Sequence, residues 1–369
     1  MKIVVVALLF IALAGCERPT SGVSPIAEAA THSEQLNAWL DQEFASYLDF
    51  SPMAKTRLGD KSDYDQLDDP SDAAADQRLA WRRASVAVMQ SQFDRSQLNA
   101  EAQRSYDLWV FMLKRAEDAK PFRRYEYVFG RSGPHTGLPN ALINFHKVDN
   151  AADMQAYISR LIASEIYLDA YLTRAKLAAD AGVRPPYFDY DVALSQIRRV
   201  NQGFPFTGEG QSALWRDITT KIGALVENKD LSESDAEGLE AAAKTAIVNH
   251  MKPAYDRIAA WLIEDRRNVA DVATGAWALP DGDAYYAYRL KQMTTLPLSA
   301  DEIHQTGLIE VARIQTEMNE IRESVGFEGD LQDFFTHLRS SDEFYFENTD
   351  TGREGYLNLA RLYIVGFDG

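Results

Sequence analysis

The sequence has 369 residues, of which 46% are hydrophobic and 25% are charged, a balance typical of a folded globular protein rather than a disordered or collagen-like one. The formal net charge is −17, so the surface repels the phosphates of nucleic acids and we expect no nucleic acid partner. Cys16 is the single cysteine, which excludes an intramolecular disulfide and any zinc site built on paired thiolates.

The first 16 residues have the layout of a secretory signal. Lys2 gives a positive start, an apolar run extends from Ile3 to Ala14, and small residues precede Cys16. The run is too short for a transmembrane helix, which needs about 20 apolar residues. Its end, Leu-Ala-Gly-Cys at 13–16, resembles a bacterial lipobox, so we predict cleavage before Cys16 and attachment of a lipid to the Cys16 thiol. The alternative is an ordinary secretory signal that contains a cysteine by chance.

A lipid at Cys16 predicts that the mature protein is anchored to a membrane in the cell envelope of a bacterium. Glu17 stands where an inner-membrane retention signal usually has Asp, which favours the periplasmic face of the outer membrane. Residues 17–30 are rich in Pro, Ser, Gly and Thr, and we predict that they form a flexible tether.

Residues 31–369 are predicted to form a single all-α domain, a multi-helix array. Apolar residues recur at helical spacing from Met154 to Leu172, and this spacing places them on one face of a helix. Asn150 is placed to cap the start of that helix, and Gly182 is placed to end it.

Two further patterns support the helical class. Pro253 should kink or restart a later helix, because proline lacks a backbone donor and clashes with the preceding turn. Ser299 and Glu302 form a capping box before another apolar stripe. Only the short aromatic segments 124–129 and 344–346 have the character of strands, so an all-α architecture is the natural prediction.

The common catalytic motifs are missing from the sequence. None of the six histidines is followed by Glu, which excludes the His-Glu-x-x-His helix of zinc peptidases from this chain. Residues 130–133 fall short of a Gly-x-Ser-x-Gly elbow, and neither a phosphate-binding nor a dinucleotide-binding glycine loop occurs. We therefore assign no catalytic residue, no metal ligand and no cofactor to this chain.

Tyrosines gather directly after a turn in residues 279–288. Tyr285 and Tyr286 are candidates for the lining of a substrate cleft, because phenol hydroxyls can donate to a developing oxyanion. The alternative is an aromatic pair of Tyr285 and Tyr288 that packs against Trp277.

His304, in the first turn after the capping box, is the third candidate for the cleft lining. Only Asp301 lies near it on the same helical face, so a packed or hydrogen-bonded histidine is favoured over a metal ligand. His135 and His146 accompany a glycine- and proline-rich segment, 133–140. That segment either presents a loop to a cleft or connects two helices.

Four stretches of the sequence carry a family resemblance: Gly137-Leu-Pro-Asn-Ala-Leu-Ile-Asn-Phe-His146, residues 153–161, Lys252-Pro-Ala-Tyr255, and above all residues 279–317. Together they resemble the bacterial lipoprotein family designated domain of unknown function (DUF) 885, over nearly all of residues 33–365. The resemblance implies a helical zinc peptidase of the gluzincin type. In such sites two histidines and a carboxylate hold zinc, and a glutamate activates the bound water.

The resemblance also implies that this chain is the N-terminal section of such a peptidase and stops before the helix that carries the zinc ligands. We expect the complete family member to hold zinc and hydrolyse peptides, and this chain alone to be inactive, so its status as an enzyme stays open. The alternative is a non-catalytic helical lipoprotein that binds peptides. A peptide is the expected ligand in both interpretations, and the oligomeric state is not predicted.

Overall fold

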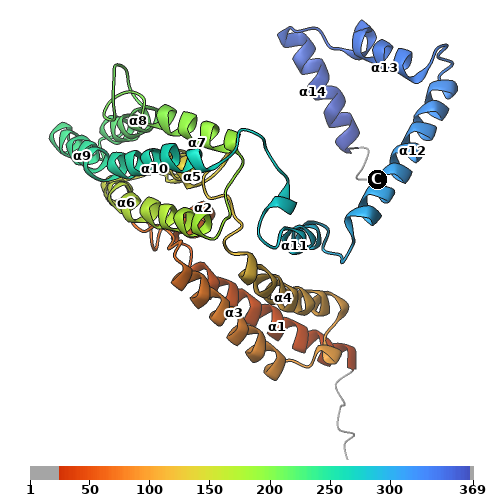
Figure 1. Ribbon diagram of the computed structural model, residues 1–369, viewed down its shortest axis with the longest axis horizontal. Helices are drawn as coiled ribbons and strands as arrows, with labels where there is room; N and C mark the ends of the chain where they lie inside the picture. The colour runs from red at the N-terminus through yellow and green to blue at the C-terminus, as the bar shows by residue number, and fades with distance from the viewer. Residues whose placement is uncertain (1–24, 366–369) are drawn as a thin grey trace, which may run out of the picture. The chain divides into compact units, whose positions relative to one another are not determined.

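The computed structural model describes residues 25–365, and this part of the chain contains helices and no β-sheet (Figure 1). The predicted all-α class is confirmed, and residues 124–129 and 344–346 form no strand. The α-helices, in chain order, are α1 (Pro25–Leu48), α2 (Pro52–Leu58), α3 (Asp72–Gln92), α4 (Ala100–Ala119), α5 (Pro134–Phe145), α6 (Ala151–Asp180), α7 (Tyr187–Val200), α8 (Ala213–Glu227), α9 (Glu233–Ala246), α10 (Lys252–Asp265), α11 (Gly282–Thr294), α12 (Ala300–Ser324), α13 (Leu331–Ser340) and α14 (Asp350–Val365). Because α1 begins at Pro25, residues 25–30 of the predicted tether are helical.

Local sequence signals set helix ends where they were predicted. The Asn150 side chain accepts a hydrogen bond from the Asp153 N–H at 3.1 Å and caps α6. Helix α6 ends just before Gly182, whose φ of 80° lies in the left-handed region. Ser299 and Glu302 form the predicted capping box at the start of α12.

Pro253 restarts a helix, as predicted. Helix α9 runs into a π-helical turn, Ile247–Met251, and α10 follows without a loop. Pro253 lies in the first turn of α10, where an α-helix tolerates its missing N–H. The wider π-helical turn absorbs the break in hydrogen bonding just before the proline.

The helical region, predicted as a single domain, divides into two compact units with the boundary inside α11. The first unit extends to Tyr288 and contains the main hydrophobic core, to which α5 to α10 contribute. Leu161 of α6, Ile218 of α8 and Tyr255 of α10 are fully buried there. Each such side chain stabilises the fold by about 1.5–3 kcal/mol through its removal from water.

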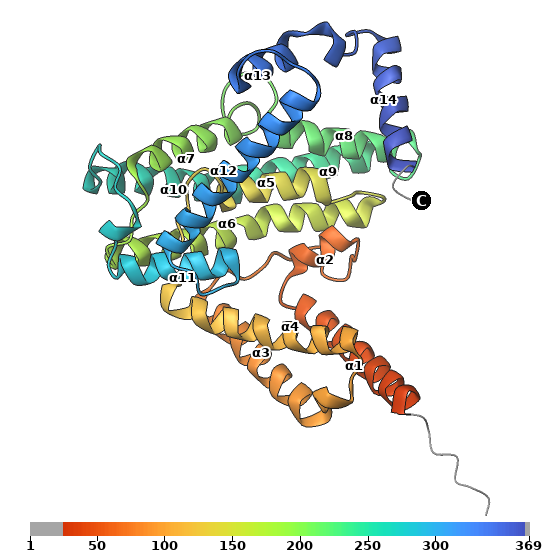
Figure 2. The ribbon, with the colours of Figure 1, turned by 90° about the vertical axis from the view of Figure 1, so that its right-hand side faces the viewer.

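A smaller core in the first unit lies among α1, α3 and α4, which run side by side in both ribbon views (Figure 2). Leu36 and Met89 are fully buried in it. Trp39 and Trp109 pack edge to face against one another, with ring centroids 6.4 Å apart. This bundle therefore has apolar contacts of its own, separate from the main core.

The second unit, residues 289–365, contains α12, α13 and α14. Phe334 is the single buried side chain among its described residues, and it packs against Phe327. The apolar stripe predicted for α12 is present, but Leu308 and Ile321 are each more than half exposed. The helices of the second unit therefore form without burying their apolar faces against one another.

Candidate functional site

A cavity of about 430 Å³ opens in the first unit, and its volume lies within the range typical of ligand sites. We name it the tyrosine cavity. Helix α2, the segments before and at the start of α5, and helix α6 supply its walls. Its lining residues are Met53, Arg57, Asp68, Glu126, Tyr127, Val128, Ser132, Gly133, Pro134, Gly137, Tyr167 and Tyr171.

Helix α6 positions two of the three tyrosines. Tyr167 and Tyr171 are four residues apart, so they lie on the same helical face, and their rings meet edge to face with centroids 5.1 Å apart. Burial raises the pKa of Tyr167 well above its ordinary value, with the neighbouring Tyr171 as a further cause. The Tyr167 phenol therefore stays protonated and keeps its hydrogen for donation.

Helix α2 and the chain that follows it supply Arg57 and Asp68. The Asp68 carboxylate accepts hydrogen bonds from the Ser51 hydroxyl and from the Met53 N–H, both at 2.9 Å. These bonds fasten the Asp68 segment to the start of α2. The Arg57 guanidinium is exposed and lies 5.6 Å from the centre of the Phe145 ring.

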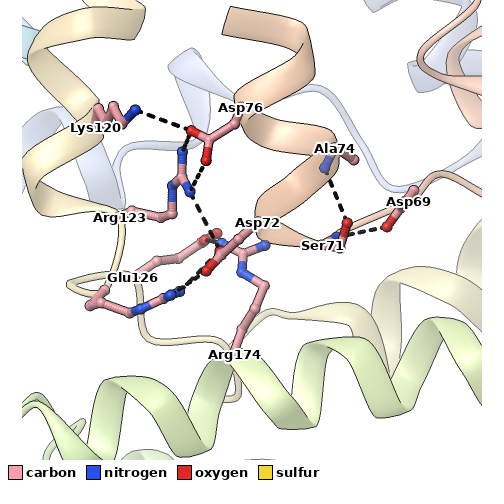
Figure 3. A network of polar contacts seen from close by, with 10 residues as sticks. Asp69, Ser71, Asp72, Ala74, Asp76, Lys120, Arg123, Glu126 and Arg174 are labelled. Atoms are coloured by element: carbon pink, nitrogen blue, oxygen red, sulfur yellow. Dashed lines mark hydrogen bonds and ion pairs between the residues drawn. The ribbon is translucent and has the colours of Figure 1, made fainter.

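Ion pairs fix the segment before α5 from two sides (Figure 3). Arg123 binds Asp76 of α3 at 2.6 Å, and Arg124 binds Asp72 at the start of the same helix. The Arg123 guanidinium holds the pKa of Asp76 well below its usual range, at about 2. These contacts attach the cavity wall to α3.

The same segment is held to α6 by Glu126, whose carboxylate binds Arg174 at 2.6 Å. The Arg174 guanidinium also lies 5.4 Å from the centre of the Tyr171 ring. Glu126 and the adjacent Tyr127 are thereby placed against the tyrosines of α6. Partial burial raises the pKa of Tyr127, so this phenol also stays neutral.

The fourth wall is the start of α5, where the sequence led us to expect a loop or connector. Residues from Pro134 onward are helical, with Gly133 at the N-cap and Pro134 at the first helical position. A Cβ atom at Gly133 would lie 2.4 Å from the Val128 carbonyl oxygen, so only glycine fits there. The expectation of a turn over residues 133–140 is therefore wrong.

Tyr255 explains why a helix can contain Pro139. A proline at this position cannot donate to the carbonyl of His135, one turn earlier in α5. The buried Tyr255 hydroxyl of α10 donates to that carbonyl instead, at 2.7 Å. Tyr255, 120 positions along the chain from His135, thus supplies the hydrogen bond that this helix lacks because of Pro139.

The two histidines of this region support α5 and do not line the cavity. His135 is fully buried and its Nε2 lies 2.7 Å from the Gln196 side-chain oxygen. His146 follows the last turn of α5, with its Nε2 2.9 Å from the Asp153 carbonyl and its Nδ1 3.0 Å from an Arg160 nitrogen. Burial lowers the pKa of His146 to about 4, so its ring is neutral.

The cleft residues predicted from the sequence lie elsewhere. Tyr285 packs against Phe122 and Tyr125, and its hydroxyl donates to the Tyr125 carbonyl at 3.3 Å. Tyr288 stacks on Phe122, so the predicted pairing of Tyr285 with Tyr288 exists within a larger aromatic cluster. Trp277, the predicted partner of that pair, is 76% exposed and has no ring contact with it among the described residues.

Tyr286 is half exposed on α11, and His304 is exposed on α12 in the second unit rather than packed. Neither residue lines the tyrosine cavity, and neither does Tyr285. Tyr285 packs instead on Tyr125, two residues before the cavity residue Tyr127. The predicted lipidation site, Cys16, lies outside the described residues.

Sequence reasoning missed Arg57, Asp68, Tyr127, Tyr167 and Tyr171. One signal was present: Tyr167 and Tyr171 stand at helical spacing beside the apolar stripe of α6. The other three come from short segments without a periodic pattern, so only the fold brings them to one place.

Metal and membrane features were also sought in residues 25–365. No three His, Cys, Asp or Glu side chains in that range come together as the ligands of a metal ion would. No helix there is both long enough and apolar enough to cross a bilayer.

A family profile described as "Bacterial protein of unknown function (DUF885)" matches residues 52–369. No curated protein matches the chain. The fold is similar to that of a candidate lipoprotein from Colwellia psychrerythraea, with a TM-score of 0.69, 19% identity, and coverage of 93% of this chain and 59% of that one. A candidate lipoprotein of unknown function from Shewanella oneidensis is similar with a TM-score of 0.53 and 17% identity, over 84% of this chain and 50% of that one. The chain thus spans little more than half the length of these solved structures.

Proposed function

The chain belongs to the bacterial DUF885 family, and from this premise we propose that it is a lipid-anchored envelope protein that binds peptides in the tyrosine cavity. We propose further that it forms the N-terminal part of a zinc peptidase. The residues that the structure describes support the peptide-binding part of this proposal.

The tyrosine cavity is the observation that carries the proposal. Peptides present polar backbone groups and apolar side chains side by side. The cavity offers both partners, because phenol hydroxyls and the charged groups of Arg57, Asp68 and Glu126 lie among aromatic faces. Rigid tyrosines on α6 bind such ligands at a low entropic cost.

Anisotropy of fluorescein-labelled tripeptides, titrated with the full chain purified from bacterial membranes, tests this proposal. We expect saturable binding that Tyr171→Ala weakens at least tenfold, because the substitution removes an aromatic wall. Tyr286→Ala is the matched control, since Tyr286 is an exposed tyrosine outside the cavity. Absence of saturable binding would contradict the proposal.

The same pair of variants separates the tyrosine cavity from the cleft predicted by sequence. A lining that includes Tyr285 and Tyr286 of α11 remains a second proposal for where a peptide binds, and His304 of the second unit remains a separate candidate for contact with a peptide. If Tyr286→Ala abolishes binding and Tyr171→Ala does not, the peptide binds at the predicted cleft and the tyrosine cavity is the wrong site.

Lipid anchoring is proposed at Cys16. The two solved structures compared above are described as candidate lipoproteins, and the sequence before Cys16 resembles a lipobox. Labelled palmitate should enter the wild-type chain and not Cys16→Ala. Separation of inner from outer membranes should then recover the wild-type chain with the outer membrane, where Glu17 directs it. Labelling of Cys16→Ala to the wild-type level would contradict this assignment.

The peptidase part of the proposal requires chain that this sequence does not include. It rests on the family resemblance, and the two solved structures compared above, of which this chain covers 59% and 50%, are longer than this chain. We expect the 369-residue chain to bind peptides without hydrolysing them. Chelator-sensitive hydrolysis, or zinc bound in a one-to-one ratio by elemental analysis, would contradict that expectation.

A non-catalytic peptide-binding lipoprotein is the alternative function, and it is favoured by a cavity whose lining lies entirely within the first unit. The DNA that follows the codon for residue 369 distinguishes the two. A His-Glu-x-x-His sequence within a few hundred bases supports the peptidase. Its absence from all three frames, with peptide binding retained, supports the binding protein.

A further inference from the structure

The charged groups of the tyrosine cavity differ in how fully they are already bound. Both carboxylates have partners: Asp68 accepts two hydrogen bonds from the start of α2, and Glu126 pairs with Arg174 at 2.6 Å. Both carboxylates therefore already have hydrogen-bond donors within the protein. A cationic ligand would have to compete with these existing bonds.

Arg57 is the exception. Its guanidinium lines the cavity and is exposed, and it forms no ion pair with any residue that the structure describes. Its carbon lies over the Phe145 ring, 5.6 Å from the ring centre, and a contact of this kind takes up none of the hydrogen-bond acceptors that its N–H groups can bind. A planar guanidinium fork matches two oxygens of a carboxylate.

Neutral donors surround this cation. Tyr127 and Tyr167 remain protonated because burial raises the pKa of each phenol. The start of α5 also forms part of the wall, and no side chain caps it, so its positive dipole end is not neutralised locally. The cavity thus presents a cation without an ion pair in the described part of the chain, together with neutral phenol hydroxyls.

We propose that the tyrosine cavity recognises the C-terminal carboxylate of a peptide, with Arg57 as its main ligand. Asp68 and Glu126 repel any anion, and they repel a phosphate group with roughly two negative charges more strongly than a carboxylate with one. The inference rests on the proposed peptide binding and adds which end of the peptide enters the cavity.

Calorimetric titration of the full chain with N-acetyl-trialanine, with its C-terminal amide, and with inorganic phosphate tests the proposal. We expect the free acid to bind at least tenfold more tightly than the amide. Arg57→Gln should remove that difference. Arg216→Gln is the matched control, because Arg216 is an exposed arginine of α8 that does not line the cavity.

Tyr127→Phe provides a second variant that keeps the ring and removes one hydroxyl. It should weaken binding of the acid a few-fold more than binding of the amide. If acid and amide bind the wild-type chain equally, the carboxylate inference is wrong while the proposed peptide binding stands. Phosphate that binds in an Arg57-dependent manner and displaces the peptide would overturn the carboxylate assignment. If no peptide binds at all, the proposed function itself fails.

Discussion

The two units differ in what holds their helices in place. In the first unit, α6 and α10 contribute buried residues such as Leu161 and Tyr255 to one core, and the buried Tyr255 hydroxyl donates a hydrogen bond within it. In the second unit, α12 has an ideal capping box and an apolar stripe, yet no residue of α12 is buried. The difference shows that capping residues and an apolar stripe can predict a helix without indicating whether that helix packs against a core.

The first unit also contains the tyrosine cavity, and its walls depend on the surrounding packing. The Glu126 segment is fixed by ion pairs to α3 and α6, and α5 depends on the Tyr255 hydroxyl. A site built in this way requires a body that is already folded. The contrast between the units therefore predicts where substitutions should be costly and where they should not.

The largest effect is expected at Arg160, which is fully buried in the first unit. Its guanidinium donates to the Gln66 carbonyl at 2.8 Å and to the Thr56 hydroxyl at 2.6 Å, and contacts His146 at 3.0 Å. Arg160→Met should reduce the free energy of unfolding by about 3–5 kcal/mol, because these buried groups lose their partner. Urea unfolding followed by tryptophan fluorescence measures it, since all six tryptophans precede residue 288.

Arg313→Met in α12 is the control for this prediction. Arg313 is exposed and pairs with Glu310 and Glu317 on the same helix, so its loss should cost at most about 1 kcal/mol in an unfolding curve followed by circular dichroism. Equal losses for the two arginines would remove the contrast between the units.

A matched pair of isoleucines gives the next largest effect. Ile218→Ala in α8 creates a cavity in the main core and should cost about 2–5 kcal/mol. Ile321→Ala in α12 affects a side chain that is 55% exposed and should cost less than about 1 kcal/mol. Urea unfolding followed by circular dichroism compares them. A loss at Ile321 as large as that at Ile218 would show that the α12 face is covered in solution.

The third prediction concerns how the free energy of unfolding changes with pH. Burial lowers the pKa of His146 from about 6.5 to about 4, so the unfolded chain binds a proton in this interval and the folded chain does not. The free energy of unfolding contributed by His146 is therefore fully present above pH 6.5 and falls by roughly 3 kcal/mol as the pH decreases to about 4.

His146→Gln should flatten this part of the pH profile, whereas His304→Gln, a substitution at the exposed histidine of the second unit, should leave it unchanged. Urea unfolding at pH 7, 5.5 and 4 measures both. A wild-type slope retained in His146→Gln would show that other groups cause the acid sensitivity.

These contrasts also show what the sequence could predict. Asn150, Pro253 and Ser299 act within one or two turns of their own positions, so the helix ends they set were predicted correctly. The start of α5 was mistaken for a turn because the compensating donor, Tyr255, lies far along the chain. The residues around Pro139 give no information about a hydrogen-bond donor so far along the chain.

The site was harder to predict than the fold for a related reason. Tyr285 and Tyr286 drew attention because they are close in sequence, whereas the residues of the tyrosine cavity come from separated segments. Arg57 has no distinguishing sequence neighbours, and its importance follows from the absence of an ion pair within the described part of the chain. Such an absence can be recognised only after the neighbours are known.

Hydrogen–deuterium exchange of the full chain, with and without N-acetyl-trialanine, tests the central claim most directly. We predict slow exchange in α6 and α10 and faster exchange in α12 and α14. We also predict that the peptide protects only the segments that line the tyrosine cavity, which are residues 53–68, 126–137 and 167–171. Peptide-dependent protection in α12 or α14 alone, or exchange in α12 as slow as in α6, would contradict it.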